Sequence, residues 1–215
     1  MPSRSYGEMC PVARSLDVVG ERWTLLIVRE LLLGPKRFTE LLNQLPTMGT
    51  NRLSERLSAL RGHGIIERHS SEASNTVSLY ELTPLGEGLR PIVLGLARWG
   101  FGLPVAEAPS APPRAELIAL GLSAAAVPSA ETQEIYQFRI GAEQFHISVD
   151  GASVRARSGV SPEPVAATVA GSLDAFLAVV SGDIAPGQTG GLEITSDAGA
   201  RLRVANLLSA VAAAQ

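Results

Sequence analysis

The first hundred residues show a predominantly helical pattern of apolar and polar positions. Apolar residues recur at intervals near 3.6 along residues 23–31, and Gly34-Pro35 is expected to end that helix, because Gly suits a helix C-terminus and Pro stops propagation. A short amphipathic helix is expected at 38–45, and a longer one at about 50–61. The longer helix has one apolar stripe, made of Leu53, Leu57 and Leu60. Its opposite side is polar, so we expect this helix to be anchored on one side and open on the other.

A change to period-two alternation follows Gly64 and predicts a β-hairpin. The expected strands are residues 65–69 and 76–82, separated by a polar, turn-rich segment. Thr83-Pro84 is typical of a helix start, with Thr as the cap and Pro in the first turn, and this helix is expected to continue to about Trp99. Helices followed by a hairpin and one more helix predict a winged helix-turn-helix domain, mainly α with a β-hairpin wing.

The chain is expected to divide at residues 104–113, which read PVAEAPSAPP. Pro cannot continue a helix or a central strand, and Ala, Ser and Glu offer little apolar surface to bury. We therefore predict a first domain at 1–103, a linker at 104–113 and a second domain at 114–215.

The second domain combines alternating and helical segments, which predicts an α+β sheet-and-helix fold. Asp150-Gly151 is a strong hairpin signal within a run of alternating residues. The expected strands are 134–140, 144–149, 153–157, 167–170 and 191–195, and the expected helices are 114–126, 173–180 and 201–214.

Charge is distributed unevenly between the two halves. The whole chain carries a net charge of −3. Residues up to Pro104 contain 12 basic and 10 acidic residues, a net +2, whereas the remainder contains 6 basic and 11 acidic residues, a net −5. Binding to a polyanion must therefore depend on a local basic surface of the first half, and the second half should be repelled by phosphate.

The first half contains several short motifs at fixed spacing: CPV at 10–12, LDVVGERWTLLI at 16–27, GPKRFTEL at 34–41, TNRLSERL at 50–57, GIIER at 64–68, YELTPLG at 80–86 and WG at 99–100. In these motifs it resembles the HxlR family of winged-helix regulators. The resemblance implies a transcription regulator that binds double-stranded DNA as a homodimer, packed through the first helix and the helix after the wing. It places the recognition helix at about 50–61. The sequence departs from the family in the wing, where Ser74, Asn75 and Thr76 replace Pro and Arg, so wing contacts should be weaker or limited to hydrogen bonds.

The side chains expected to contact DNA lie at two places. Thr50, Asn51 and Arg52 occupy the first turn of the recognition helix, where Arg can bond guanine and Asn can pair with adenine. The wider set of expected contacts consists of Lys36, Arg37, Thr50, Asn51, Arg52, Arg56, Asn75 and Thr76, with Lys36 and Arg37 directed at phosphate. The alternative for Arg56 is a surface arginine that pairs with Glu55 or Glu67.

Cys10 is the single cysteine of the chain, which excludes an internal disulfide and fits a reducing cytoplasm. Some members of the family sense oxidants near this position, and Cys10 precedes Pro11 at an expected helix start, where a thiolate is favoured. The alternative is an inert, half-buried structural cysteine.

The second half contains the looser motifs FHISVDG at 145–151, VAGSLDAFL at 169–177 and SGD at 181–183. In these motifs it resembles the sterol carrier protein (SCP-type) lipid-binding fold. The resemblance implies an apolar cavity for a hydrophobic effector, and the alternative is a filled core. The candidate lining residues are Tyr136, Phe138, Phe145, Ile147, Phe176 and Leu177.

Catalytic and metal-binding patterns are missing from the sequence. It has no nucleophile elbow and no Walker A motif, and the expected surface or turn histidines His63, His69 and His146 are not spaced as metal ligands. We therefore expect a cytoplasmic protein that is not an enzyme, has no cofactor or metal and spans no membrane. We expect a DNA-binding regulator, a repressor of a palindromic operator. The alternative is a lipid-binding or protein-interaction module whose winged helix serves dimerisation.

Overall fold

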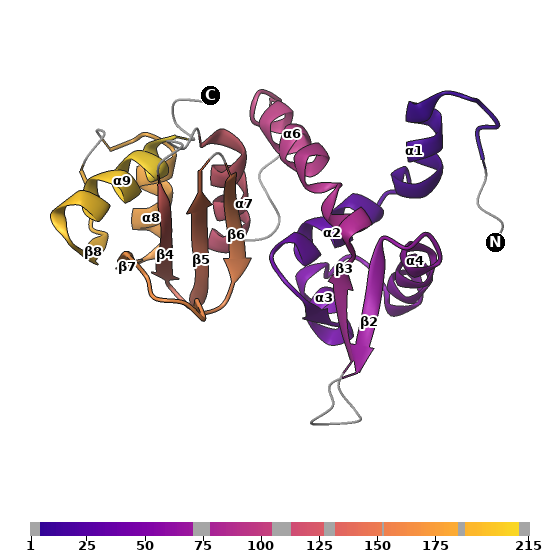
Figure 1. The fold of residues 1–215 in the computed structure, drawn as a ribbon, viewed down its shortest axis with the longest axis horizontal. Coiled ribbons are helices and arrows are strands. Elements are labelled where there is room, and N and C mark those ends of the chain that lie inside the picture. The colour runs from indigo at the N-terminus through magenta and orange to yellow at the C-terminus, as the bar shows by residue number, and fades with distance from the viewer. Residues whose placement is uncertain are drawn as a thin grey trace. The chain divides into compact units, whose positions relative to one another are not determined.

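The protein consists of two compact units, residues 1–93 and 94–215, and each is described separately. The computed structural model describes residues 5–70, 78–104, 113–126, 132–151, 153–184 and 188–210. Most of the expected linker at 104–113 lies outside these ranges. The division between the units falls within helix α6, Arg90–Phe101 (Figure 1). Among the described residues, no helix has the length and apolar character needed to cross a bilayer.

The helices of the N-terminal unit begin and end where the local sequence signals them. Pro11 opens α1 after the extended residue Cys10, and Gly34, with a φ of 125°, follows the end of α2. The helices are α1 (Pro11–Val19), α2 (Thr24–Leu32), α3 (Phe38–Gln44), α4 (Thr50–Gly62), α5 (Pro84–Glu87) and the start of α6.

The wing is a three-stranded antiparallel sheet with the order β1-β3-β2. Strands β2 (Ile66–Ser70) and β3 (Ser78–Leu82) form the predicted hairpin, and Ile66 pairs with Leu82 at its base. The third strand, β1 (Lys36–Arg37), was not predicted, and its Lys36 pairs with Tyr80 of β3. Two residues are too few to show a period in the sequence, so this strand is defined by its pairing alone.

The helix after the wing is broken, although the sequence predicted one continuous helix from Thr83 to about Trp99. Thr83 caps α5 as expected, since its hydroxyl oxygen accepts a hydrogen bond from the N–H of Gly86 at 3.1 Å. The helix stops at Gly88, and α6 restarts at Arg90. Glycine is a poor helix former, and the two glycines within five residues favour this break.

The N-terminal core gathers the apolar faces of α2, α3 and α4 beneath the sheet. The predicted stripe of α4 is confirmed, because Leu53, Leu57 and Leu60 are all buried. The other large contributors to the core are Ile27, Val28, Leu31, Leu32, Leu41, Leu45, Met48, Ile65 and Ile66.

The C-terminal unit is the expected α+β domain, built on a five-stranded sheet with the order β6-β5-β4-β7-β8. Strand β4 pairs with β7 in parallel, and the remaining neighbours are antiparallel. Its elements are α7 (Ala115–Ala125), β4 (Gln133–Ile140), β5 (Glu143–Asp150), β6 (Ser153–Ser158), β7 (Ala167–Gly171), α8 (Leu173–Val180), β8 (Glu193–Ser196) and α9 (Ala198–Ser209).

One face of this sheet carries the hydrophobic core and is covered by helices (Figure 1). Phe138 and Phe145 stack with their ring centroids 4.9 Å apart, and Phe176 of α8 meets both rings edge-on at 6.2 and 6.1 Å. All three phenylalanines have no exposed surface. Offset and edge-on aromatic contacts of this kind stabilise a core beyond the area that they bury.

The opposite face of the sheet is polar and is crossed by the segment that leads from β6 to β7. The amide of Gln137 donates to the Gly159 carbonyl and accepts from the N–H of Ser161, and His146 Nδ1 lies 3.3 Å from the same carbonyl. His146 is therefore 9% exposed in a strand. The expectation of a surface or turn histidine was wrong for His146, because the segment around Gly159, 13 residues further along the chain, covers this position of the strand.

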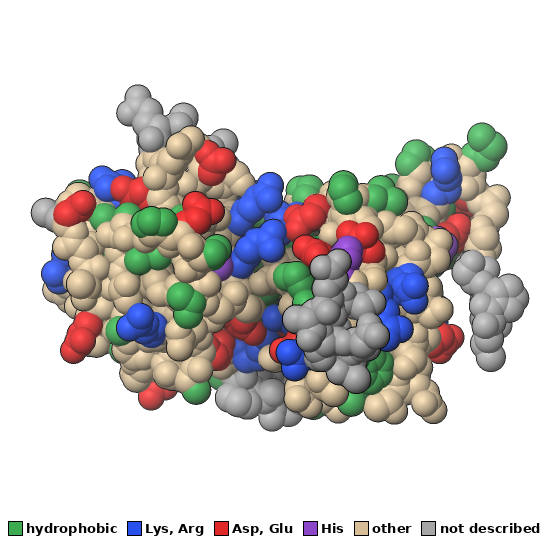
Figure 2. All heavy atoms as spheres, turned by 60° about the horizontal axis from the view of Figure 1, so that its bottom comes forward, with side chains coloured by type: hydrophobic (Ala, Val, Ile, Leu, Met, Phe, Trp, Pro, Cys, Tyr) green, Lys and Arg blue, Asp and Glu red, His purple; other side chains and the backbone are tan. Residues whose placement is uncertain are grey.

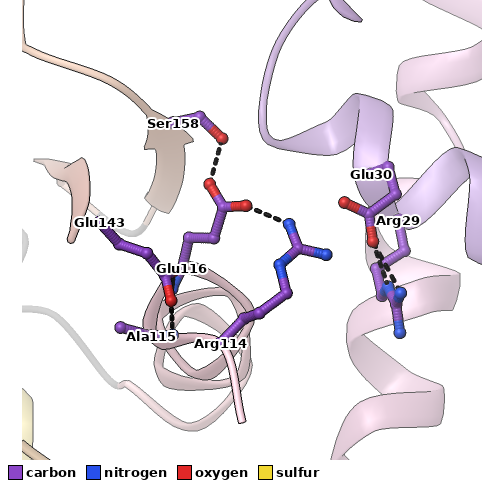
Figure 3. A network of polar contacts seen from close by, with 7 residues as sticks. All are labelled: Arg29, Glu30, Arg114, Ala115, Glu116, Glu143 and Ser158. Atoms are coloured by element: carbon purple, nitrogen blue, oxygen red, sulfur yellow. Dashed lines mark hydrogen bonds and ion pairs between the residues drawn. The ribbon is translucent and has the colours of Figure 1, made fainter. Parts of the chain in front are cut away.

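A carboxylate network holds the start of α7 against the sheet (Figure 3). Glu143 of β5 accepts hydrogen bonds from the backbone N–H groups of Ala115 and Glu116 at 3.1 and 3.0 Å, which satisfies two unpaired donors of the helix terminus. The carboxylate of Glu116 in turn accepts from Ser158 at 2.5 Å and pairs with Arg114. The anion at this N-terminus is also favoured by the helix dipole.

Helix α9 is tied to β4 by an ion pair between Arg203 and Glu134. Arg203 Nε donates to Glu134 Oε2 at 2.9 Å, and the Tyr136 hydroxyl donates to the same oxygen at 2.5 Å. The hydrogen bond from Arg203, together with that from Tyr136, lowers the pKa of Glu134 below its usual value despite partial burial. The pKa of Tyr136 is raised, first by burial and then by the neighbouring carboxylate.

Candidate nucleic-acid interface

The first turn of α4 is open to solvent while the back of the helix is anchored. Gly49, in an extended conformation, precedes Thr50, and its carbonyl accepts the N–H of Leu53 at 3.0 Å. Thr50, Asn51 and Arg52 are exposed, as the sequence predicted for side chains that reach outward. A surface hollow surrounds this turn and is lined by Thr47, Gly49, Thr50, Asn51, Arg52 and Glu55.

The outermost ridge of α4 follows from its helical geometry. At 100° per residue, Asn51, Glu55 and Ser58 lie opposite the buried stripe of leucines. All three are exposed. Arg52 and Arg56 lie on one flank of this ridge. A surface that enters a groove would therefore present Asn51 and Glu55 first, with the arginines beside them.

Arg56 is engaged with acidic neighbours on the same surface. Its Nη2 atom lies 3.2 Å from Glu55 Oε1, and its Nη1 atom lies 3.8 Å from Glu21 Oε2. Its side chain is 19% exposed, whereas the two carboxylates are more than half exposed. The alternative of pairing with Glu55 is thus observed, and a contact of Arg56 with DNA stays a prediction.

Lys36 is buried, and its expected contact with phosphate stays a prediction. Pairing with Tyr80 places Lys36 on the face of the sheet that carries the buried residues Ile66 and Leu82, because side chains alternate along a strand. Lys36 is 7% exposed. The neighbouring Arg37 points the other way and is exposed, so it is the better placed of the two for phosphate.

The wing is described only near its base. Asn75 and Thr76 lie outside the described residues, so the expected contacts there remain untested. At the described end, Arg68 donates to the Ser78 hydroxyl at 2.8 Å, and His69 lies between Glu67 and Glu81 at 3.3 and 3.8 Å. His69 is exposed, as expected from the sequence.

The surface around the lower end of β2 and β3 carries both signs of charge. Figure 2 shows basic side chains interspersed with acidic ones on this side of the N-terminal unit. The acidic members near α4 include Glu21 and Glu55. Attraction of a polyanion here would depend on individual arginines rather than on a broad positive field.

Among the described residues, helices α1 and α6 each present more than one exposed large apolar residue. Val12 and Leu16 are one turn apart on α1, with exposed fractions of 66% and 43%. On α6, Ile92, Leu96 and Trp99 follow the spacing i, i+4, i+7 and are each 45% exposed or more. Exposed apolar residues that recur along one side of a helix are typical of a protein interface.

Cys10 is exposed at the N-terminal cap position of α1, directly before Pro11. It is the single cysteine of the sequence, so a disulfide would have to involve another molecule. Its proposed oxidant-sensing role stays a prediction.

The expected ligand-lining residues lie together in the C-terminal unit. Tyr136, Phe138, Phe145, Ile147 and Phe176 are 1% exposed or less, and Leu177 is half-buried. The packing of the three phenylalanine rings on one another fits the alternative of a filled core. Among the described residues, no group of three or more His, Cys, Asp or Glu side chains is arranged to hold a metal ion.

Two residues of the outermost ridge of α4, Glu55 and Ser58, were not among the DNA contacts expected from the sequence. Glu55 was expected only as a possible partner of Arg56. The signal was available, because the position opposite a leucine stripe can be read from the helical period alone.

Comparison with known proteins places this unit in a family. Residues 18–103 match the model of the HxlR-like helix-turn-helix family. The HTH-type transcriptional regulator YvaP of Bacillus subtilis is 37% identical over 96 residues, which cover 44% of this chain and 89% of that protein. The HTH-type transcriptional regulator sll1512 of Synechocystis is 32% identical over 99 residues, which cover 46% of this chain and 73% of that protein.

Among solved structures, the reduced form of the transcriptional regulator YodB from B. subtilis aligns with a TM-score of 0.40 at 33% identity, covering 43% of this chain and 92% of that one. The segment that matches the family model contains the helix-turn-helix, the wing and α6. Because the match to the regulator YvaP covers 89% of that protein at 37% identity, the chain belongs to the HxlR-like helix-turn-helix family of DNA-binding transcriptional regulators.

Proposed function

We propose that the protein is a homodimeric repressor that reads a palindromic operator with α4. The observation that carries this proposal is the two-sidedness of α4, whose leucines are buried while Asn51 and Arg52 are exposed. The major groove of B-DNA is about 12 Å wide and admits a helix of this kind. The distribution of polar and apolar side chains leaves the first turn available to base edges.

The exposed side chains suit distinct parts of a duplex. Arg52 offers two donors to the O6 and N7 atoms of guanine, and Asn51 offers one donor and one acceptor to adenine. Thr50 can bond either a base or a phosphate. Arg37, at the start of α3, would contact the sugar-phosphate backbone and set the position of the domain on the duplex without reading sequence.

The homodimer is proposed to form through the exposed apolar residues of α1 and α6. Two copies related by a two-fold axis would place their recognition helices at half-sites about 34 Å apart. A charged residue at the centre of this surface should separate the copies. Leu96→Glu is expected to sediment as a monomer and to bind a palindromic duplex much more weakly than the parent, while keeping its helical content.

Fluorescence anisotropy with the full chain tests operator binding. Labelled duplexes from the region upstream of the gene are compared with random duplexes at several salt concentrations. Arg52→Ala should reduce the difference in affinity between upstream and random duplexes. Arg37→Ala should weaken binding to both kinds of duplex and lower the slope of log affinity against log salt concentration by about 1. Arg155→Ala, an exposed arginine in β6, is the matched control and should leave both properties unchanged.

The alternative is a lipid-binding or protein-interaction module whose winged helix serves dimerisation. It predicts weak binding that salt abolishes and no preference for any duplex. If the parent protein behaves in this way, operator recognition is excluded. Repression itself is tested by deleting the gene, which should raise transcription from a promoter that overlaps the bound site.

We further propose that the C-terminal unit modulates DNA binding through a hydrophobic ligand. The sheet-and-helix order supports this, since apolar sites commonly form between such layers. The packed rings of Phe138, Phe145 and Phe176 require that a ligand enter beside them or displace them. A fluorescent long-chain fatty acid is the probe. Saturable binding that changes operator affinity supports the role, and absence of binding excludes this ligand class.

A further inference from the structure

The outermost ridge of the recognition helix includes a carboxylate, which is unusual at a surface that meets a polyanion. Glu55 lies opposite the buried stripe of α4, one turn after Asn51, and lines the hollow at the start of the helix. Its side chain is 55% exposed. A helix that enters the major groove with its leucines in the core must therefore bring this carboxylate close to the base edges.

The carboxylate has a partner that leaves part of it free. Arg56 Nη2 lies 3.2 Å from Oε1, and no other hydrogen bond or ion pair reaches Glu55 within the described part of the chain. A carboxylate has two oxygens and about four acceptor sites, so Oε2 remains able to accept a hydrogen bond. Exposed pairs of this kind contribute little to stability, so this contact can be exchanged for another partner at low cost.

The chemistry of the groove restricts what this oxygen can meet. Phosphates and the edges of guanine present acceptors and repel a carboxylate. Thymine presents an acceptor and a methyl group, and adenine places an acceptor beside its amino group. Cytosine presents only its 4-amino donor, and acidic side chains read cytosine in this way.

We infer that Glu55 is a base-reading residue that selects a cytosine in each half-site by accepting a hydrogen bond from the 4-amino group. The inference rests on the proposed function, because it requires α4 to lie in the major groove. Asn51 and Arg52 then read neighbouring positions, and Glu55 contributes discrimination at the cost of general attraction to phosphate.

The test is selection of bound duplexes from a random library with the full-length parent, Glu55→Gln and Glu55→Ala. The parent should select a C·G pair at one position of each half-site. Glu55→Gln should shift that position toward adenine, because glutamine bonds adenine through two groups, and Glu55→Ala should lose the preference. Replacing the selected C·G pair in the duplex should weaken binding by the parent about 5- to 150-fold. The same replacement should weaken binding by Glu55→Ala much less.

Removing a negative charge also strengthens binding to any duplex, so a matched control is required. Glu67→Gln removes one carboxylate of similar exposure from β2, away from the ridge, and should leave the selected sequence unchanged. If Glu55→Gln and Glu55→Ala select the parent sequence and gain affinity uniformly, Glu55 only repels phosphate and the inference is wrong. If the parent itself selects no sequence, the proposed function fails, and the inference fails with it.

Discussion

The base of the wing depends on a close approach that only glycine permits, at Gly86 of α5. A Cβ atom at this position would lie 2.1 Å from the carbonyl oxygen of Ile65 and 3.0 Å from Leu82 Cδ2. Ordinary contact begins near 3.4 Å, so the oxygen or the helix must move by about 1 Å. Gly86→Ala therefore forces a displacement where α5 meets the first residues of the hairpin.

The cost can be worked out from the hydrogen bonds at this point. The Ile65 carbonyl accepts the backbone N–H of Thr83 at 3.0 Å, and the Thr83 hydroxyl donates to Gly64 at 2.6 Å and caps α5. Overpacking costs about 1–3 kcal/mol, a weakened hydrogen bond about 1 kcal/mol, and a disturbed cap about 1 kcal/mol. Alanine favours a helix more than glycine does, which offsets this loss of stability by about 1 kcal/mol. The expected net loss in the free energy of unfolding is about 2–4 kcal/mol.

Urea unfolding followed by tryptophan fluorescence measures this loss. Both tryptophans, Trp23 and Trp99, precede the linker, and Trp23 is 9% exposed, so its emission reports on the N-terminal unit. Gly62→Ala is the control, because a Cβ atom there meets nothing within 4 Å, and it should stabilise by up to about 1 kcal/mol. A Gly86→Ala protein that unfolds within about 0.5 kcal/mol of the parent would refute the reasoning.

Two further predictions concern the C-terminal unit. Phe176→Ala should lower the stability of this unit by about 3–5 kcal/mol. One calorimetric transition should shift, while the transition reported by the buried Trp23 stays unchanged. A loss below about 1 kcal/mol would indicate that the ring lines open space. The lowered pKa of Glu134 means that its carboxylate contributes stability above its unfolded pKa of about 4.3, and that this contribution is lost as pH falls through the folded pKa. Arg203→Ala should therefore reduce the melting temperature at pH 7 and have little effect on it at pH 2. Glu134→Gln should reproduce the reduction at pH 7. An equal reduction at both pH values would contradict a stabilising role of the Glu134 carboxylate.

Local sequence patterns were sufficient to predict features that depend on a single helix or strand. The stripe of Leu53, Leu57 and Leu60 predicted both the extent of α4 and which side would be exposed, and alternation around Phe138 and Phe145 predicted the strands of the second sheet. Periodicity carries this information because burial of one face is a property of a single helix or strand.

The orientation of particular side chains depended on partners distant in the sequence. Lys36 became buried because a two-residue strand pairs with Tyr80, and His146 became buried because the segment from Gly159 crosses its face of the sheet. Arg56 was engaged by Glu21, which lies in the segment between α1 and α2.

The sequence by itself therefore determined the order of elements, the two-sidedness of α4 and the family to which its motifs point. The tertiary structure alone decided which basic residues remain exposed, where the helix after the wing breaks, and how the aromatic rings of the second unit pack. The physical reason is the distance along the chain over which each determinant acts. Hydrophobic period and capping act over a few residues, whereas strand register, crossover paths and close contacts such as that of Gly86 with Ile65 exist only once distant segments meet.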